Sequence, residues 1–234
     1  FKNLAFDAKN EYSVPYMWGT VGIIYNKTMV QEPVDSWGIL WNKKYAKQIL
    51  MVDSPRDSIG VTLKYLGYSL NTDKDNEIEA AKLKLIEQKP LVLAYVVDEV
   101  KDKMIAGEAA MAVVWSGDAM FMKEKNPDLE YAIPKEGTNL WFDSIVIPKG
   151  AKHKKEAEEF INYLSRPDIA QRNVEYIGYA TPIPEVEKNL DPDVQADIAA
   201  YPGDQILANT EVFDDLSKNL VKYDKAWTEI KAAR

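Results

Sequence analysis

The sequence predicts an α/β fold in which helices are layered on a sheet. Runs of apolar and β-branched residues alternate with amphipathic segments up to Pro148, and this alternation is typical of layered α/β domains. Helical patterns dominate after Pro148. The 234 residues suffice for one large domain or for two smaller lobes that bury a hydrophobic core.

Strands are predicted where apolar runs end at turn-forming residues. The first covers 12–26, an aromatic and β-branched segment that a proline and a glycine are expected to interrupt. Shorter strands are predicted at 49–52, 91–97, 109–115, 129–134 and 140–148. In the last of these, Phe142 alternates with Trp141 and Asp143 across the pleat.

Helices are predicted from capping signals and from apolar residues at helical spacing. Ser54 is a favourable N-cap, Pro55 suits the first helical position, and Asp57 completes the spacing of a capping box. This helix is expected to end at Gly67. Further helices are predicted at 37–41, 77–88, 98–107, 116–122, 154–164, 168–177, 194–200 and 213–233.

Composition disfavours several classes of function. The net charge of −8 argues against nucleic acid and anionic membranes as partners. The chain has no cysteine, and its one histidine, His153, lies in a charged segment expected at the surface. Thiolate nucleophiles, histidine-based triads and zinc sites are therefore disfavoured, and neither a metal nor a cofactor is predicted. No stretch of the sequence is long and apolar enough to span a bilayer.

Three predicted strand-to-helix junctions carry polar and aromatic side chains. If their strands are parallel neighbours, all three junctions face one cleft at the carboxyl edge of the sheet. The side chains at these junctions are Asp53, Ser54, Asp57, Asp98, Trp115 and Asp118. Each also has a purely structural interpretation: the acids and Ser54 as helix caps or partners of the helix dipole, and Trp115 as part of the core.

The pair Trp141 and Asp143 indicates a cationic ligand. A carboxylate holds an ammonium group by charge-assisted hydrogen bonds, and an indole face attracts it by cation–π interaction. Several carboxylates between aromatic walls suit a long, flexible polycation, whose methylene segments lie on the rings. The alternative interpretation is a half-exposed strand with a solvated aspartate.

Six segments of the sequence carry a resemblance to a known family. They are YSVPYMWGTVGIIYN, SWGILWNKKYAKQILMVDSPRD, GYSLNT, MIAGEAAMAVVWSGDA, NLWFDSIVIPKGAKHKKEAEEFINYLSRPDIA and YIGYATP. Through nearly all of its length the chain resembles the spermidine/putrescine-binding proteins of bacterial polyamine ABC importers. The resemblance implies a non-enzymatic, extracytoplasmic protein, either in the periplasm or anchored at the outer face of the cytoplasmic membrane. Its implied partners are a polyamine ligand and the subunits of an ABC permease.

The resemblance also implies ligand contacts at particular positions. The expected ligand-binding residues are Trp115, Trp141, Asp143, Asp57, Tyr179, Ser54, Asp53 and Phe213. The carboxylate of Asp143 would meet an ammonium group. The acidic pair of the family falls on Ser54 and Asp57, so one acid is a serine here, and Asp53 is the candidate replacement. A late glutamine of the family falls on Phe213, which could add an aromatic wall but cannot accept a hydrogen bond.

A periplasmic-binding-protein-like fold of type II, with two lobes, is implied as well. Residues 1–29 are expected to end lobe one and cross over, and 30–135 to form a complete α/β lobe two. Residues 136–148 are expected to cross back, and 149–234 to return as helices into lobe one. Family members carry a further segment before YSVPY, so the first part of lobe one is expected to be missing. Exposed apolar surface is then expected after Pro148, covered by self-association or by a rearranged tail.

Two other functions remain open from the residues alone. Aromatic walls also suit a sugar, and tyrosine pairs suit ferric iron, so another solute is one alternative. A glycoside hydrolase would need two carboxylates about 5–10 Å apart, and Asp57 and Asp143 are the candidates. No nucleophile motif, phosphate-binding glycine loop or metal-ligand spacing accompanies them.

Overall fold

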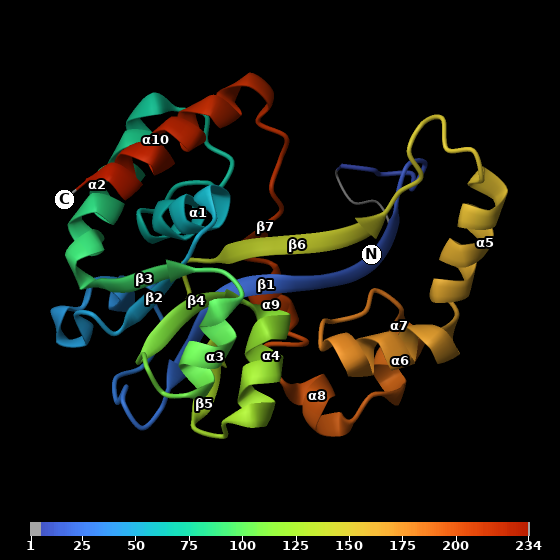
Figure 1. The fold of residues 1–234 in the computed structure, drawn as a ribbon, viewed down its shortest axis with the longest axis horizontal. Coiled ribbons are helices and arrows are strands. Elements are labelled where there is room, and N and C mark those ends of the chain that lie inside the picture. The colour runs from blue at the N-terminus through green and yellow to red at the C-terminus, as the bar shows by residue number, and fades with distance from the viewer. Residues whose placement is uncertain (1–5, 234) are drawn as a thin grey trace.

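The computed structural model describes residues 6–233, and a mixed sheet organises this part of the chain (Figure 1). Its strands are β1 (Val14–Asn26), β2 (Ile49–Val52), β3 (Val92–Val96), β4 (Met111–Trp115), β5 (Leu129–Ala132), β6 (Thr138–Ile145) and β7 (Thr210–Glu211). They lie in the order β3-β2-β4-β1-β6-β7, and β5 pairs with β1. Helices alternate with the strands from β2 to β5, which confirms the predicted α/β fold.

Strands β2, β3 and β4 form a parallel part of the sheet. β2 lies between the other two, and all four of its residues are buried, as expected for a parallel strand that is covered on both faces. Because these strands run in the same direction, the junctions that follow them lie along one edge of the sheet. The condition under which the three junctions share one edge is therefore met.

Strands β1 and β6 are antiparallel and connect two parts of the molecule (Figure 1). The expected interruption of β1 is small, because its register shifts only between Pro15 and Met17, where proline cannot donate to the ladder. Gly19 stays within the ladder, opposite Trp141. Both strands thus run from the α/β body toward the helices that follow residue 150 (Figure 1).

The first helix of the α/β body begins at its predicted cap. The Ser54 hydroxyl accepts a hydrogen bond from the Asp57 N–H at 3.5 Å and donates one to the Asp57 carboxylate at 2.7 Å. The helices are α1 (Pro55–Tyr65), α2 (Asp75–Gln88), α3 (Glu99–Ile105), α4 (Ser116–Lys125), α5 (Lys154–Leu164), α6 (Pro167–Ile177), α7 (Pro184–Asn189), α8 (Pro192–Ala196), α9 (Asp204–Leu207) and α10 (Leu220–Ala232). α10 begins seven residues later than predicted, because a short 3-10 turn at Ser217–Asn219 precedes it.

Apolar cores on the two faces of the sheet hold these elements together. One core packs α1, α2 and α10 on the sheet and includes the fully buried Trp37 and Tyr223. The core on the other face packs α3, α4 and β5 around Met104 and Tyr131. A third, smaller core joins α6 and α7 to Met17 of β1.

The end of the chain returns to lobe two, the α/β body of residues 30–135. Helix α10 packs along α2 and α1 (Figure 1), because its apolar face, with Tyr223 and Ile230, completes the core on that side. The predicted division gave all of 149–234 to lobe one. The last part of the chain packs on the α/β body, and the division into lobes stays a prediction.

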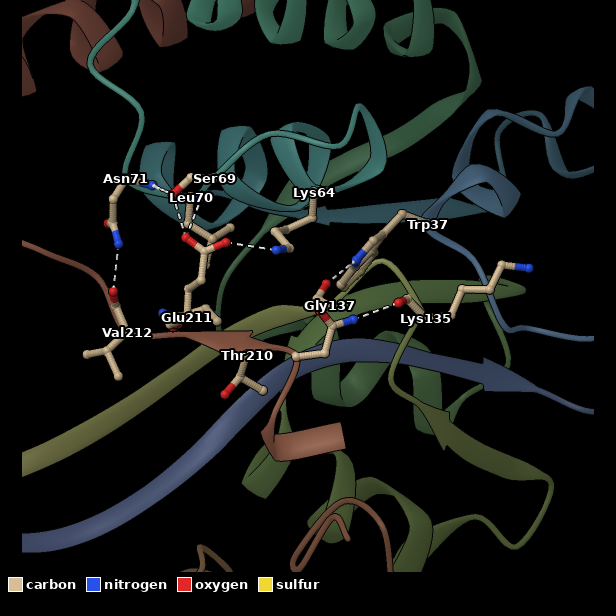
Figure 2. Close-up of polar contacts among 12 residues, drawn as sticks. Trp37, Lys64, Ser69, Leu70, Asn71, Lys135, Gly137, Thr210, Glu211 and Val212 are labelled. Atoms are coloured by element: carbon tan, nitrogen blue, oxygen red, sulfur yellow. Dashed lines mark hydrogen bonds and ion pairs between the residues drawn. The ribbon is translucent and has the colours of Figure 1, made fainter. Parts of the chain in front are cut away.

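Glu211 fixes the segment that leads into α10 (Figure 2). Its carboxylate pairs with Lys64 of α1 at 2.7 Å and accepts hydrogen bonds from the Ser69 hydroxyl and the Leu70 N–H. Glu211 belongs to β7, and the backbone of this strand also pairs with β6. The returning segment is tied both to the sheet and to α1.

Helices α5 to α8 form the part of the described chain that lies farthest from α10 (Figure 1). No residue of α5 is buried, and Phe160 is 59% exposed and Tyr176 92%. Exposed apolar surface is therefore present after Pro148, as expected, although what covers it stays a prediction. Among the helices of residues 6–233, none is both long and apolar enough to cross a membrane.

Candidate ligand-binding site

Four of the predicted site residues line one cleft of about 240 Å³. Trp115 stands at the end of β4, Trp141 and Asp143 lie on β6, and Tyr179 follows the end of α6. The cleft therefore combines the carboxyl edge of the parallel strands with a crossing strand and with the helical part beyond it. Residues that are far apart in the sequence meet there as predicted.

The pairing of β1 with β6 fixes the indole of Trp141. Gly19 lies opposite it in the ladder, and a Cβ atom on Gly19 would lie only 2.5 Å from Cζ2 of the indole. The indole N–H donates to the Thr20 carbonyl oxygen at 3.3 Å. The ring thus lies directly over the β1 backbone, where a side chain at position 19 would exclude it.

Tyr179 is positioned by the left-handed end of α6. Gly178 has φ of 86° and forms the C-cap of that helix, a conformation that glycine adopts without a steric penalty. The next residue, Tyr179, then places its ring 5.0 Å from the Trp141 ring, with an angle of 83° between the planes. This edge-to-face geometry is a favourable one for two aromatic rings.

Burial raises the pKa of Tyr179, and the negative charges of Asp118, Asp143 and Asp98 raise it further. A potential that disfavours a phenolate favours a cation in the same place. The cleft therefore combines aromatic walls with a negative electrostatic potential.

Asp143 is the carboxylate that lines the cleft. Partial burial raises its pKa above the ordinary value, although the side chain keeps contact with solvent. Within residues 6–233 no hydrogen bond or ion pair engages it. An uncompensated carboxylate beside two aromatic rings is the arrangement that an ammonium group would complete.

Ser54 and Asp57 do not line the cleft, but Asp57 interacts with the Trp115 side chain and Ser54 with Asp57. Asp57 is 8% exposed, and burial raises its pKa, against the opposing effects of Ser54, Arg56 and the Trp115 side chain. The interaction between Trp115 and Asp57 connects the capped start of α1 with the aromatic wall. The predicted cap is therefore observed, while the role of both residues in ligand binding stays a prediction.

Asp53 and Phe213 have other partners and do not line the cleft. The Asp53 carboxylate accepts a hydrogen bond from Lys231 of α10 at 2.9 Å. The Phe213 ring lies 4.3 Å from the guanidinium carbon of Arg56. Their expected roles in ligand binding stay predictions. Asp53 would have to leave Lys231, and Phe213 would have to leave Arg56, to contact a ligand.

The remaining junction acids form a chain of charges beside the cleft. Lys101 pairs with the exposed Asp98 at 2.9 Å and with Asp118 at 3.4 Å. Burial raises the pKa of Asp118, while Lys101 and the Tyr179 hydroxyl act in the opposite direction. Within residues 6–233 no group of three or more His, Cys, Asp or Glu residues is arranged to hold a metal ion.

Ser116, Thr20 and Gly19 contribute to the site, although sequence analysis did not single out their contacts. The Ser116 hydroxyl accepts a hydrogen bond from the Thr20 N–H at 3.2 Å, which joins the start of α4 to β1. The sequence carries one local sign of these contacts. Gly19 lies inside a predicted strand, where a glycine indicates the close approach of another group.

Comparison with known proteins places the chain among solute-binding proteins. Residues 2–202 match the family model described as bacterial extracellular solute-binding protein. The spermidine/putrescine-binding periplasmic protein of Salmonella typhimurium is 37% identical over 233 residues, covering 99% of this chain and 67% of that protein. The putrescine-binding periplasmic protein SpuD of Pseudomonas aeruginosa is 30% identical over 252 residues, covering 97% of this chain and 67% of the other.

Solved structures agree with these sequence relatives. A putative spermidine/putrescine ABC transporter protein of Listeria monocytogenes superposes with a TM-score of 0.94 at 44% identity, covering 100% of this chain and 73% of the other. The spermidine/putrescine ABC transporter substrate-binding protein PotD of Streptococcus pneumoniae superposes with a TM-score of 0.89 at 39% identity, covering 98% of this chain and 71% of the other.

These findings confirm the predicted fold class and the prediction that the chain is a binding protein, not an enzyme. They also confirm the extracytoplasmic location, since the family is extracellular and the sequence relatives are periplasmic. By sequence and by fold, the chain belongs to the family of bacterial extracellular solute-binding proteins.

Proposed function

We propose that this chain captures a polyamine, such as spermidine or putrescine, in the cleft of Trp115, Trp141, Asp143 and Tyr179, and delivers it to an ABC permease. The observation that carries the proposal is the Asp143 carboxylate, which lines an aromatic cleft without a hydrogen bond or ion pair from residues 6–233. The named relatives that bind spermidine and putrescine support the same ligand class.

The chemistry of the ligand fits the walls of the cleft. Alkyl ammonium groups have pKa values near that of lysine, about 10.4, so a polyamine is charged at neutral pH. One ammonium group would pair with Asp143, while the methylene segments lie on the Trp141 and Trp115 rings. The hydrogen bond from the Trp141 indole N–H to the Thr20 carbonyl oxygen holds this ring in a fixed orientation, so little ordering is left for the binding step.

Selectivity for a cation follows from the cost of leaving charges unpaired. A neutral diol of similar length would fill the cleft but would leave Asp143 uncompensated, in surroundings that already raise its pKa. A site built to pair with a charge rejects an analogue that lacks the charge. Asp118 and Asp98 extend the negative potential beyond Asp143, which suits a ligand that carries more than one cation.

Capture and release require the parts around the cleft to move. β1 and β6 are the strands that connect the α/β body with the helices after residue 150 (Figure 1), and hinge motions use a few residues at such crossings. We assign the hinges to residues 18–20 and 134–139. Closing would bring Tyr179 over the ligand, and opening at the permease would release it.

Thermal-shift and calorimetric screening test the proposal. Spermidine and putrescine should raise the midpoint of thermal unfolding and give a saturable heat of binding. 1,4-Butanediol, glucose and ferric citrate should do neither at the same concentration. Binding of the sugar or of iron in preference to both amines would contradict the proposed ligand class.

A further inference from the structure

Tyr179 lies on the backbone of the first turn of α4. A Cβ atom added to Gly117, the second residue of that helix, would lie 1.7 Å from Cδ1, 1.8 Å from Cε1 and 2.6 Å from Cγ of the Tyr179 ring. Real Cβ atoms do not approach other heavy atoms so closely. The ring occupies the space that any side chain at position 117 would need.

The backbone conformation of Gly117 does not itself require glycine. Gly117 is absent from the glycines with positive φ, which are Gly67, Gly107, Gly137, Gly150 and Gly178. At a helical position without such a contact, alanine stabilises the helix by about 1 kcal/mol relative to glycine. The reason for a glycine here is therefore the contact with Tyr179 and not the geometry of the helix.

We infer that Gly117 is a positioning residue of the binding site: its missing side chain lets the Tyr179 ring sit on α4 and complete the cleft against Trp141. The inference rests on the proposed function and adds a residue that does not itself line the cleft. Through this contact, position 117 sets how closely the segment after α6 approaches lobe two, and hence how tightly the ligand is enclosed.

Helix α4 is held too firmly to move away from an added methyl group. At its far end Lys123 pairs with Asp197 at 2.6 Å, and both side chains are largely buried. Its apolar face packs Ala119 and Met122 into the core that also contains Ala199. We therefore expect the adjustment to a side chain at position 117 to fall mainly on Tyr179.

The Tyr179 ring has space into which it can move. It lines a second, mostly apolar cavity of about 310 Å³ as well as the binding cleft. Met120 and Phe121 of α4 also line this second cavity, as do Tyr176 and Ile177 of α6. A methyl group at position 117 would thus move the ring away from Trp141 and open one wall of the cleft.

A double-mutant cycle measured by titration with spermidine tests this inference. We expect Gly117→Ala to weaken binding about tenfold or more, because a wall of the cleft is displaced. In the background of Tyr179→Ala, where the ring is absent, the same change should alter the Kd by less than about twofold. Gly203→Ala is the matched control, since nothing lies within 4 Å of a Cβ atom there, and it should bind like the parent.

A second measurement needs no ligand. The chain has no cysteine, so spin labels attached at Phe121→Cys and Tyr176→Cys report the distance across the second cavity. Gly117→Ala should shift or broaden this distance distribution, and Gly203→Ala should not. If Gly117→Ala impairs folding, combining it with Tyr179→Ala should restore folding, because the clash is then removed.

The outcomes separate the inference from the proposed function. If the parent binds spermidine and Gly117→Ala binds equally well, the inference is wrong and the function stands. Equal weakening by Gly117→Ala with and without the Tyr179 ring would also overturn it. If the parent binds no amine, the proposed function fails, and an unchanged spin-label distance would then refute the positioning role independently.

Discussion

The ring of Tyr179 meets the indole of Trp141 edge to face, with 5.0 Å between the centroids and 83° between the planes. One residue belongs to a crossing strand and the other to the turn after α6. Each ring also lies on a glycine, Trp141 on Gly19 and Tyr179 on Gly117. The aromatic corner of the cleft is therefore built from two side chains and from two positions without side chains.

Removing the indole should weaken polyamine binding. Trp141→Ala deletes an aromatic face, and such a face contributes about 0.5–2 kcal/mol to the binding of a cation. We therefore expect a Kd that is higher by about twofold to thirtyfold, measured by calorimetric titration. Trp41, which stacks on Tyr65 and does not line the cleft, provides the control: Trp41→Ala should leave the Kd unchanged when the protein is folded.

Affinity for a polyamine should fall as the pH is lowered. The ligand prefers the ionised form of Asp143, whose pKa partial burial raises above 3.8. Affinity is then constant well above this raised pKa and declines as the pH falls through it, with release of a proton on binding in that range. Titrations from pH 8 to pH 4 should show the decline. Asp143→Asn should flatten part of this decline.

Glu211 should stabilise the fold at neutral pH. Burial tends to raise its pKa, but Lys64 and Ser69 outweigh burial and hold it below 4.5. The stability that it contributes is present above pH 4.5 and is lost as the pH falls through the lowered value. Glu211→Gln should cost about 1–3 kcal/mol in urea unfolding at pH 7, because Lys64 loses its partner. Glu124→Gln, at an exposed ion pair, should cost less than about 0.5 kcal/mol.

Asp57 should change the stability of the fold with pH in the opposite direction to Glu211. Burial raises its pKa above 3.8, so the native state holds its proton more tightly, and stability declines as the pH rises from 3.8 through the raised value. Asp57→Asn removes a buried charge and should raise the free energy of unfolding at pH 7 by about 1 kcal/mol. If Asp57 also contacts the ligand, the same variant should bind spermidine more weakly. A loss of stability at pH 7 would contradict this interpretation.

Self-association should depend on the exposed face of α5. Phe160 and Tyr163 are 59% and 45% exposed and lie on a helix without a buried residue, and contiguous apolar surface of this kind favours association. Light scattering at increasing concentration should show dimers, and Phe160→Glu should shift the protein toward monomers. A monomer over the whole range in the parent would refute the prediction.

Local signals in the sequence predicted much of this architecture. The apolar runs predicted the strands of the parallel part of the sheet, and Ser54-Pro55 predicted the start of α1. The resemblance to polyamine-binding proteins brought Trp115, Trp141, Asp143 and Tyr179 into one site, and the structure gathers the same four around a cleft.

The sequence did not predict the contacts between segments that are far apart in the chain. Lys231 pairs with Asp53 across 178 residues of sequence, and Arg56 covers Phe213. Neither contact leaves a local pattern, because both depend on where α10 and the segment before it return. The roles of Gly19 and Gly117 were hidden for the same reason, since a close approach depends on a ring brought from another element.

Calorimetric titration of spermidine into the parent, Asp143→Asn and Asp224→Asn tests the central claim most directly. Asp224 is an exposed acid on α10, so its variant matches the change of charge without touching the cleft. A charge-assisted contact of about 1.5–3 kcal/mol predicts binding by the parent and by Asp224→Asn, and a Kd at least about tenfold higher for Asp143→Asn. Equal affinity of all three proteins for spermidine would contradict the account.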